Sequence, residues 1–440
     1  MNSHHKAILR LGVPIAIGQL GVIIMGFADT MMVGRYSTDA LAAASFANSV
    51  FNLFTFLLMG YSYGLTPLVS SLFGRGRKVE AGGVLKQAVA ANLLFALFLA
   101  GLLSVAYFGL HRMGQPAELL PLIRPYYAAL TASLVFVALF NALRQFTDGI
   151  TETRTAMWAL LTGNALNIIG NYLLIYGIGP FPELGLTGAG ISTLFSRIAM
   201  AAILLAVLLL RRRYAVYREG VSQTPLHGAG LRHINSRSLP IALQMGMESG
   251  AFTFTGIMAG WIGAVDLATY QVMVTLGTLG FLFYYSFGAG VSIRVAVFYG
   301  RKDWAQLRRA VRAGTHILLG MALCSSLVFF FWGESIIRLF TTDSVVIALS
   351  LSLIPPLILY QLGDAMQICF ANALRGTSHV MPMMWIAFVS YIVVNIPAGY
   401  LLAFPLGCGI YGLFIAFSLG LFVAAALFFT QFRRVMRRVE

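Results

Sequence analysis

Charge is scarce in this sequence, and acidic charge is the scarcest. Only 10% of the 440 residues are charged, with 15 Asp and Glu against 30 Lys and Arg. A soluble domain carries roughly 25% charged residues, so an ordinary soluble fold is excluded. Hydrophobic residues make up 59% of the chain, and they form long runs rather than the alternating segments of an outer-membrane barrel. Because a helix satisfies its own backbone hydrogen bonds in lipid, the sequence predicts an all-α polytopic membrane protein.

Cysteine and catalytic motifs are also scarce. Cys324, Cys369 and Cys408 stand singly in apolar segments, without the spacing of metal ligands, and we interpret them as packing residues. His316 and His379 are isolated as well. No HExxH, GxSxG or Walker sequence occurs. We therefore expect neither an enzyme nor a cofactor.

Twelve stretches are apolar enough to cross a bilayer, which takes about 20 residues for ~30 Å of hydrocarbon. The short polar start of the chain precedes the first stretch without a small-residue cleavage site, so we expect that stretch to be retained as an anchor. The predicted spans are 11–33, 43–72, 86–110, 124–147, 155–178, 187–210, 239–263, 268–298, 309–332, 346–374, 380–404 and 410–431.

The basic residues favour one orientation of these spans. If both termini are cytoplasmic, most of the 30 Lys and Arg residues fall in the termini and in the cytoplasmic connections. This asymmetry is the positive-inside pattern. We therefore predict two cytoplasmic termini and attribute the net charge of +15 to topology, with the lipid bilayer and not a nucleic acid as the surrounding partner.

The chain repeats itself at an ungapped offset of 226 residues. Six spans make one repeat, so both halves have the same orientation and should be related by a pseudo-two-fold axis along the membrane normal. We predict two pseudo-symmetric six-helix lobes, 1–210 and 238–440, joined by a basic cytoplasmic linker, 211–237. Two similar bundles that rock against each other suit a transporter. The matches include Pro14-Ile15-Ala16 with Pro240-Ile241-Ala242, Gly34 with Gly260, Gly64 with Gly290, and Phe73-Gly74-Arg75 with Tyr299-Gly300-Arg301.

Only three acidic residues lie well inside the predicted spans: Asp29, Glu248 and Asp364. A carboxylate at the centre of a span costs roughly 2.5–3.5 kcal/mol on insertion scales, so each is a candidate for function. Polar residues at helical spacing form polar faces in three spans. These sets are Gln244 with Glu248, Tyr360 with Asp364 and Gln367, and Asn164 with Asn167 and Asn171.

Glu248 and Asp364, with the Tyr360 phenol nearby, suggest a cation site. They can supply oxygen ligands to a partly dehydrated Na⁺, or they can hold a proton between them, because like charges in a low dielectric disfavour double ionisation. An organic cation would compete for the same carboxylates, which is the minimum requirement of antiport. The alternative is that the acids only satisfy buried helix–helix hydrogen bonds or pair with Arg197, the one base inside a span.

Three stretches resemble the multidrug and toxic compound extrusion family, in particular its bacterial NorM-like branch. The similarity extends over essentially the whole chain. The matching stretches are Gly26-Phe27-Ala28-Asp29-Thr30-Met31-Met32-Val33-Gly34-Arg35, Leu239-Pro240-Ile241-Ala242 leading to Glu248, and Asp364-Ala365-Met366-Gln367 leading to Ala373-Leu374-Arg375-Gly376.

The resemblance implies a V-shaped fold of two six-helix lobes in the bacterial inner membrane, which exports cationic, amphipathic drugs in exchange for Na⁺ or H⁺. It implies a cation site at Glu248, Asp364 and Tyr360, and a polar cluster in the first lobe. Asp29, Asn167 and Asn171 would form that cluster, and we add Asn164 from its spacing.

Phe281 departs from the pattern of the family, because some relatives have a tyrosine that supports the cation there. Only a cation–π contact could remain at this position. We expect Na⁺ coupling, with H⁺ as the open alternative, and a protein that acts as a monomer. A flippase for a lipid-linked saccharide or another lipid is the alternative function, although such a cavity should carry several Arg and Lys residues.

Overall fold

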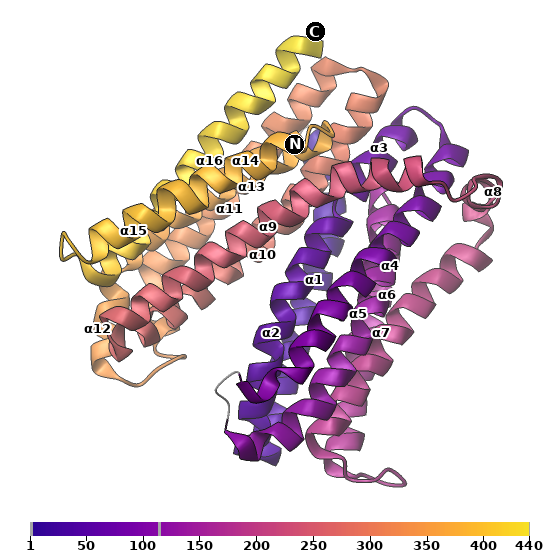
Figure 1. The fold of residues 1–440 in the computed structure, drawn as a ribbon. Coiled ribbons are helices and arrows are strands. Elements are labelled where there is room, and N and C mark those ends of the chain that lie inside the picture. Colours follow the sequence, from indigo (N-terminus) through magenta and orange to yellow (C-terminus); the bar gives the residue numbers. More distant parts are fainter. Residues whose placement is uncertain (1–2, 113–115, 440) are drawn as a thin grey trace. The chain divides into compact units, whose positions relative to one another are not determined.

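The computed structural model describes residues 3–112 and 116–439, and within them the chain is almost entirely helical (Figure 1). The helices of the first half are α1 (Ser3–Tyr36), α2 (Thr38–Ser62), α3 (Leu65–Gly74), α4 (Lys78–Phe108), α5 (Leu120–Gly149), α6 (Thr153–Tyr176), α7 (Gly185–Leu210) and α8 (Ala215–Gln223). Those of the second half are α9 (Gly228–Ile262), α10 (Ala264–Arg301), α11 (Trp304–Ile337), α12 (Ser344–Ser352), α13 (Ile354–Gly376), α14 (Met381–Ala387), α15 (Ile396–Ala403) and α16 (Gly409–Val439). Short 3₁₀ turns are η1 (Leu110–Arg112), η2 (Ala117–Leu119) and η3 (Arg212–Tyr214), and η4 (Phe388–Asn395) is a π-helix.

The described helices agree broadly with twelve predicted spans. Ten stretches are long and apolar enough to cross a membrane, and α12 with α13 makes an eleventh if this pair, bent by 52°, is one span. The helix that corresponds to the remaining predicted span is α9. Both α9 and α13 carry a predicted intramembrane carboxylate together with other polar residues, which lower the mean hydropathy of these helices.

Three predicted spans are interrupted rather than continuous. The predicted span 346–374 breaks at Leu353, where Pro355 and Pro356 begin α13 and cannot extend a preceding helix. The predicted span 43–72 divides into α2 and α3 at Tyr63 and Gly64. The predicted span 380–404 contains the π-helical η4, which ends just before a proline at the start of α15.

The chain divides into two compact units that exchange the first parts of two helices. The N-terminal unit comprises Ile17–Ala242, and the C-terminal unit comprises the described residues up to Ala16 together with those from Leu243 onward. These units differ from the predicted ranges 1–210 and 238–440, because α1 and α9 each contribute to both. The two boundaries follow Pro14 and Pro240, which lie inside their helices and are equivalent in the 226-residue repeat.

Contacts at both ends of the exchange explain this division. Near the start of α1, the His4 side chain contacts Gln306 through Nε2 and Oε1 at 2.8 Å, and the ring of His5 stacks on that of His316. Near the start of α9, Tyr61 donates a hydrogen bond to Asn235. Each helix start is therefore anchored by side chains distant in sequence.

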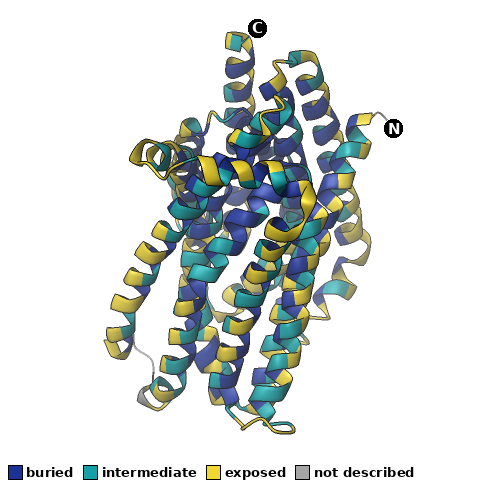
Figure 2. Cartoon of the chain, turned by 90° about the vertical axis from the view of Figure 1, so that its right-hand side faces the viewer, coloured by how far each residue is buried: buried dark blue, intermediate teal, exposed yellow. Residues whose placement is uncertain are grey.

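Each unit has its own apolar core. The core of the N-terminal unit contains one cluster around Phe146 and Tyr217 and another around Phe51 and Tyr127. The core of the C-terminal unit includes Tyr360 among its aromatic residues. Exposed residues run along the lengths of the helices (Figure 2), and many of them are large and apolar. In a membrane protein such a surface contacts lipid tails, so its exposure agrees with the predicted bilayer setting.

The predicted linker 211–237 is largely ordered and helical. It contains η3, α8 and the start of α9. Glycines allow α8 to lie against the start of α4: a side chain at Gly220 would collide with the backbone carbonyl of Val79, and one at Gly82 with that of Tyr217. The helix α8 is thus packed tightly on the N-terminal unit.

Candidate functional site

A polar cavity of about 540 Å³ lies inside the N-terminal unit. It is lined from α1, α2, α5 and α7, and its ionisable residues include Asp29 and Arg197. Asp29 is half-buried, and Asn48 and Asn52 bring amide groups from α2. The cavity therefore offers both signs of charge together with neutral hydrogen-bonding groups.

The predicted asparagines of α6 lie beside this cavity in three different ways. Asn171 donates a hydrogen bond to the Asp29 carboxylate. Asn167 is fully buried and donates from Nδ2 to Thr193 Oγ1 at 3.2 Å, and Thr193 lines the cavity. Asn164 lies against Gly21 of α1, at 3.0 Å between its Nδ2 and the position of an added Cβ. The structure thus brings Asn171 to Asp29 directly, while Asn167 and Asn164 support the wall.

Arg197 also lines the cavity, although it was not predicted from the sequence as a site residue. Its guanidinium donates to Ser133 and lies 4.8 Å from the ring centroid of Phe51, within cation–π range. It also interacts electrostatically with Asp29 and with Tyr126. The available signal was its position as the one base inside a predicted span, a placement that is rarely without function.

A second cluster of carboxyl and phenol groups lies in the C-terminal unit. Glu248 on α9 and Asp364 on α13 interact electrostatically with each other, and both interact with the phenol of Tyr360. Asp364 is only 1% exposed, and its Oδ2 atom has no hydrogen-bond partner within the described residues. Glu248 is enclosed by protein but keeps some solvent access. Two like charges and an unsatisfied oxygen fit the binding of a cation.

Two tyrosines of this cluster were not predicted from the sequence. Tyr391 on η4 interacts electrostatically with the Glu248 carboxylate, and its buried hydroxyl has no hydrogen-bond partner among the described residues. Tyr284 on α10 interacts electrostatically with Asp364 and shares a 2.5 Å hydrogen bond with Ser325. For Tyr391 the signal was the spacing of Ser390, Tyr391 and Asn395, three buried polar residues within an otherwise apolar span.

Phe281, the predicted supporter of the cation, contacts Tyr285 one turn further along α10. The two rings stack with centroids 5.6 Å apart. Its role in ion coupling stays a prediction.

A metal centre of the transition-metal type has no candidate within the described residues, because they contain no group of three or more His, Cys, Asp or Glu side chains that could hold an ion. Na⁺ has different requirements. A carboxylate and phenol oxygen set such as Glu248, Asp364 and Tyr360 suits a hard cation, and here the ion would be cargo rather than a resident cofactor.

Two comparisons connect this architecture with known proteins. The MatE family matches the chain twice, over residues 14–173 and 240–401, and the matches begin 226 residues apart. The predicted repeat is therefore confirmed. A probable multidrug resistance protein NorM of Bradyrhizobium diazoefficiens is 30% identical over 441 residues, covering 98% of this chain and 93% of the relative. The multidrug resistance protein NorM of Vibrio cholerae is 29% identical, covering 96% and 93%.

Solved structures agree with the fold. An outward-facing multidrug resistance MATE family transporter of the MOP superfamily aligns with a TM-score of 0.89 at 21% identity, covering all of this chain and 97% of the other. A MOP superfamily transporter from Pyrococcus furiosus, described as having a binding pocket of reverse polarity, aligns with a TM-score of 0.88 at 21% identity over the same shares. Together with the twofold family match, these findings show that the chain belongs to the MatE family of multi-pass membrane transporters and is not an enzyme.

Proposed function

We propose that this protein is a secondary active exporter of organic cations, which it exchanges for Na⁺ or H⁺ by alternating access of its two units. The relatives described as multidrug resistance proteins support export of small toxic compounds. The observation that carries the exchange is the buried pair Glu248 and Asp364, which interact with each other and with Tyr360. Two carboxylates that disfavour each other's charge bind a cation strongly, and alternating access would couple that cation to a drug bound at a separate site.

We propose Glu248, Asp364 and Tyr360 as the coupling site, with Tyr391 as a further oxygen donor. A Na⁺ ion gains oxygen ligands from this set, including the unsatisfied Asp364 Oδ2. A proton shared by the two carboxylates relieves the same repulsion. The number of available oxygens favours Na⁺.

The polar cavity of the N-terminal unit is the proposed drug site. Its volume of about 540 Å³ is within the range of small-molecule pockets. Asp29 would pair with the positive charge of the drug, while Met25 and Phe51 offer apolar contact. Arg197 would partly neutralise the charge of the Asp29 carboxylate until a cationic drug replaces that interaction.

A flippase for an anionic lipid is less well supported. Its cavity should carry several bases that neutralise phosphate groups. Among the described residues that line the polar cavity, Arg197 is the one base, and Asp29 offsets its charge. We also infer a bacterial inner-membrane location with both termini cytoplasmic, from the distribution of basic residues, and a monomer in function.

Export from proteoliposomes tests the proposal. An inward Na⁺ gradient, imposed at clamped pH and voltage, should drive a fluorescent organic cation out of the lumen of the proteoliposomes. Glu248→Gln should abolish this movement. The Glu334→Gln variant is the matched control, because Glu334 is exposed and pairs with Arg338. Export driven only by a pH gradient would identify H⁺ and not Na⁺ as the coupling ion. Full export by Glu248→Gln under both gradients would overturn the coupling site.

A further inference from the structure

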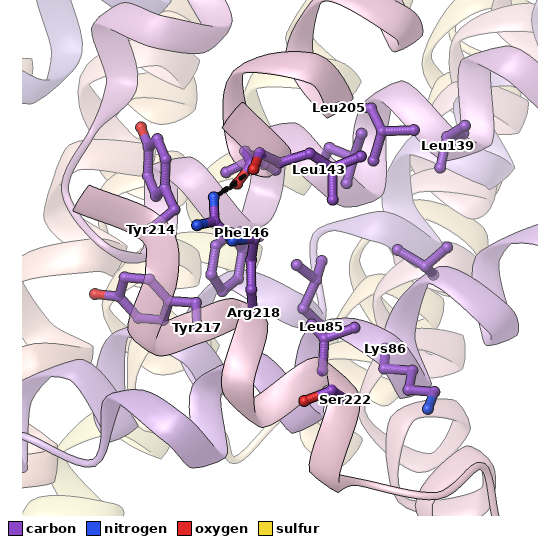
Figure 3. A pocket seen from close by; sticks show the side chains of 14 residues that line it. Leu85, Lys86, Leu139, Leu143, Phe146, Leu205, Tyr214, Tyr217, Arg218 and Ser222 are labelled. Atoms are coloured by element: carbon purple, nitrogen blue, oxygen red, sulfur yellow. Dashed lines mark hydrogen bonds between the residues drawn. The ribbon is translucent and has the colours of Figure 1, made fainter. Parts of the chain in front are cut away.

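A second cavity lies at the end of the N-terminal unit where α8 packs against α4, α5 and α7 (Figure 3). Its volume is about 350 Å³. Its wall is formed by aliphatic and aromatic side chains, and the close-up shows Leu139, Leu143 and Leu205 on one side of the space and Leu85 on the other. Such a space suits a hydrocarbon chain and offers little to a polar solute.

The surroundings of this cavity are lipid-facing. Leu209 and Leu210 at the end of α7 are 55% and 82% exposed, and Val216 at the start of α8 is 43% exposed. Large apolar residues with this exposure, next to an apolar cavity, belong to the boundary between hydrocarbon and headgroups. A lipid tail could therefore reach the cavity without crossing water.

Basic groups accompany the apolar wall. Lys86 and Arg218 line the cavity, and Arg211, Arg212 and Arg213 occupy the connection that precedes α8. Lys86 Nζ is held by a 2.8 Å hydrogen bond to the Thr224 carbonyl, and Arg218 Nη1 donates to backbone carbonyls at the end of α7. Arg218 is thus held towards the start of α8 and Lys86 towards its end, and each adds to the positive potential that attracts an anionic headgroup.

The cavity does not suit an organic cation. None of its 14 lining residues is acidic, so a positive charge would find no partner and would meet Lys86 and Arg218. An apolar interior beside fixed positive charges matches an amphiphile with a negative head.

The cavity is also preformed. The residues of α8 that line it, Tyr217, Arg218, Val221 and Ser222, share one helical face. The close approach at Gly220 and Gly82 holds that face at a fixed distance from α4. Binding here would require little ordering, which favours affinity.

We propose that this cavity binds an acyl chain of an anionic phospholipid, whose headgroup is attracted by the positive charges of Lys86 and Arg218. The lipid is a bound component that secures α8 against α4 and α7. It is neither the exported substrate nor the coupling ion, so the proposal stands apart from the proposed function.

Native mass spectrometry of the delipidated full chain, titrated with phosphatidylglycerol or phosphatidylcholine, tests this assignment. We expect preferential retention of phosphatidylglycerol. Lys86→Gln should lower that preference about fivefold, because a basic residue near the membrane surface contributes on the order of 1 kcal/mol to anionic lipid binding, and adding Arg218→Gln should lower it further. Val89→Phe, which fills the cavity from α4, should weaken the binding of both lipids equally.

Matched controls separate this site from the general surface. Val105→Phe changes an exposed residue at the other end of α4, and Arg433→Gln removes a base from α16; both should retain lipid like the unchanged protein. Thermal unfolding of each variant verifies folding. Unchanged phosphatidylglycerol binding in both Lys86→Gln and Val89→Phe would overturn the proposal. So would equal competition by glycerophosphoglycerol, which has the headgroup but no acyl chains.

Discussion

Asn171 donates a side-chain hydrogen bond to the carboxylate of Asp29, and this bond joins α6 to α1 within the N-terminal unit. The two residues are far apart in sequence, and each lies in an apolar span. The bond fixes the orientation of the one acid that lines the polar cavity. The proposed drug site would therefore depend on a charged group and on a neutral residue that positions it.

Removal of that bond should weaken binding of organic cations without removing the charge. A hydrogen bond to a charged group contributes about 1.5–3 kcal/mol, so Asn171→Ala should lower the affinity for a cationic dye by about ten- to a hundredfold, while Asp29→Asn should abolish export. Binding is measured by fluorescence anisotropy on purified protein. Asn167→Ala is the comparison variant and should lower the affinity less, because Asn167 donates to Thr193 in the cavity wall and not to Asp29; an equal loss in that variant would contradict the positioning role.

The hydroxyl of Tyr391 should affect the coupling ion and not the drug. Tyr391→Phe keeps the ring in the core but removes the group that interacts with Glu248. We expect the ion concentration for half-maximal export to rise severalfold, because one oxygen donor is lost from the cluster. Dye affinity should stay unchanged.

The comparison variant for this experiment is Tyr400→Phe, which changes an exposed tyrosine of α15. Its ion dependence should equal that of the unchanged protein. A shift of dye affinity in Tyr391→Phe, with no change in ion dependence, would contradict the assignment of Tyr391 to ion coupling.

Features carried by contiguous residues were predictable from the sequence. Apolar runs indicate helices because lipid offers the backbone no other hydrogen-bond partners, and the match of Pro14-Ile15-Ala16 to Pro240-Ile241-Ala242 revealed the repeat, which the twofold family match confirms. The carboxylates were conspicuous because charge is costly within a span.

Features that depend on packing between distant segments were not predictable. Arg197 and Asp29 share a cavity only because α7 and α1 are brought together by the fold. The exchange of helix starts between units rests on contacts such as His4 with Gln306, which helical periodicity does not encode. The docking of α8 depends on Gly82 and Gly220, and their separate positions in the sequence give no sign that they face the same interface.

The packing of α8 makes Gly220 sensitive to a single methyl group. Gly220→Ala would place a Cβ against the Val79 carbonyl, and overpacking of this kind costs about 1–3 kcal/mol. We expect a lower thermal midpoint for the purified protein. In Gly228→Ala the added Cβ meets no atom within 4 Å, so this variant should melt at least as high as the unchanged protein, and equal midpoints for both variants would contradict tight α8 packing.

Pro14 and Pro240 should act as equivalent flexible points. Each lies inside a helix two residues before the boundary between units, and a proline there removes a backbone hydrogen bond to the residue four positions earlier. Replacement by Ala restores that donor and stiffens the helix. We therefore expect Pro14→Ala and Pro240→Ala to unfold at the same or a higher temperature, while the initial rate of export from proteoliposomes falls severalfold.

Pro121→Ala separates this effect from a general response to proline removal. Pro121 stands in the first turn of α5, where a backbone N–H has no hydrogen-bond acceptor within the helix. Export by Pro121→Ala should therefore continue at the unchanged rate. The stiffness argument also predicts that the double variant at Pro14 and Pro240 is slower than either single variant, because each helix then resists bending independently. Unchanged rates in both single variants, with thermal midpoints preserved, would show that the exchange of helix starts between the units is a static feature of the fold.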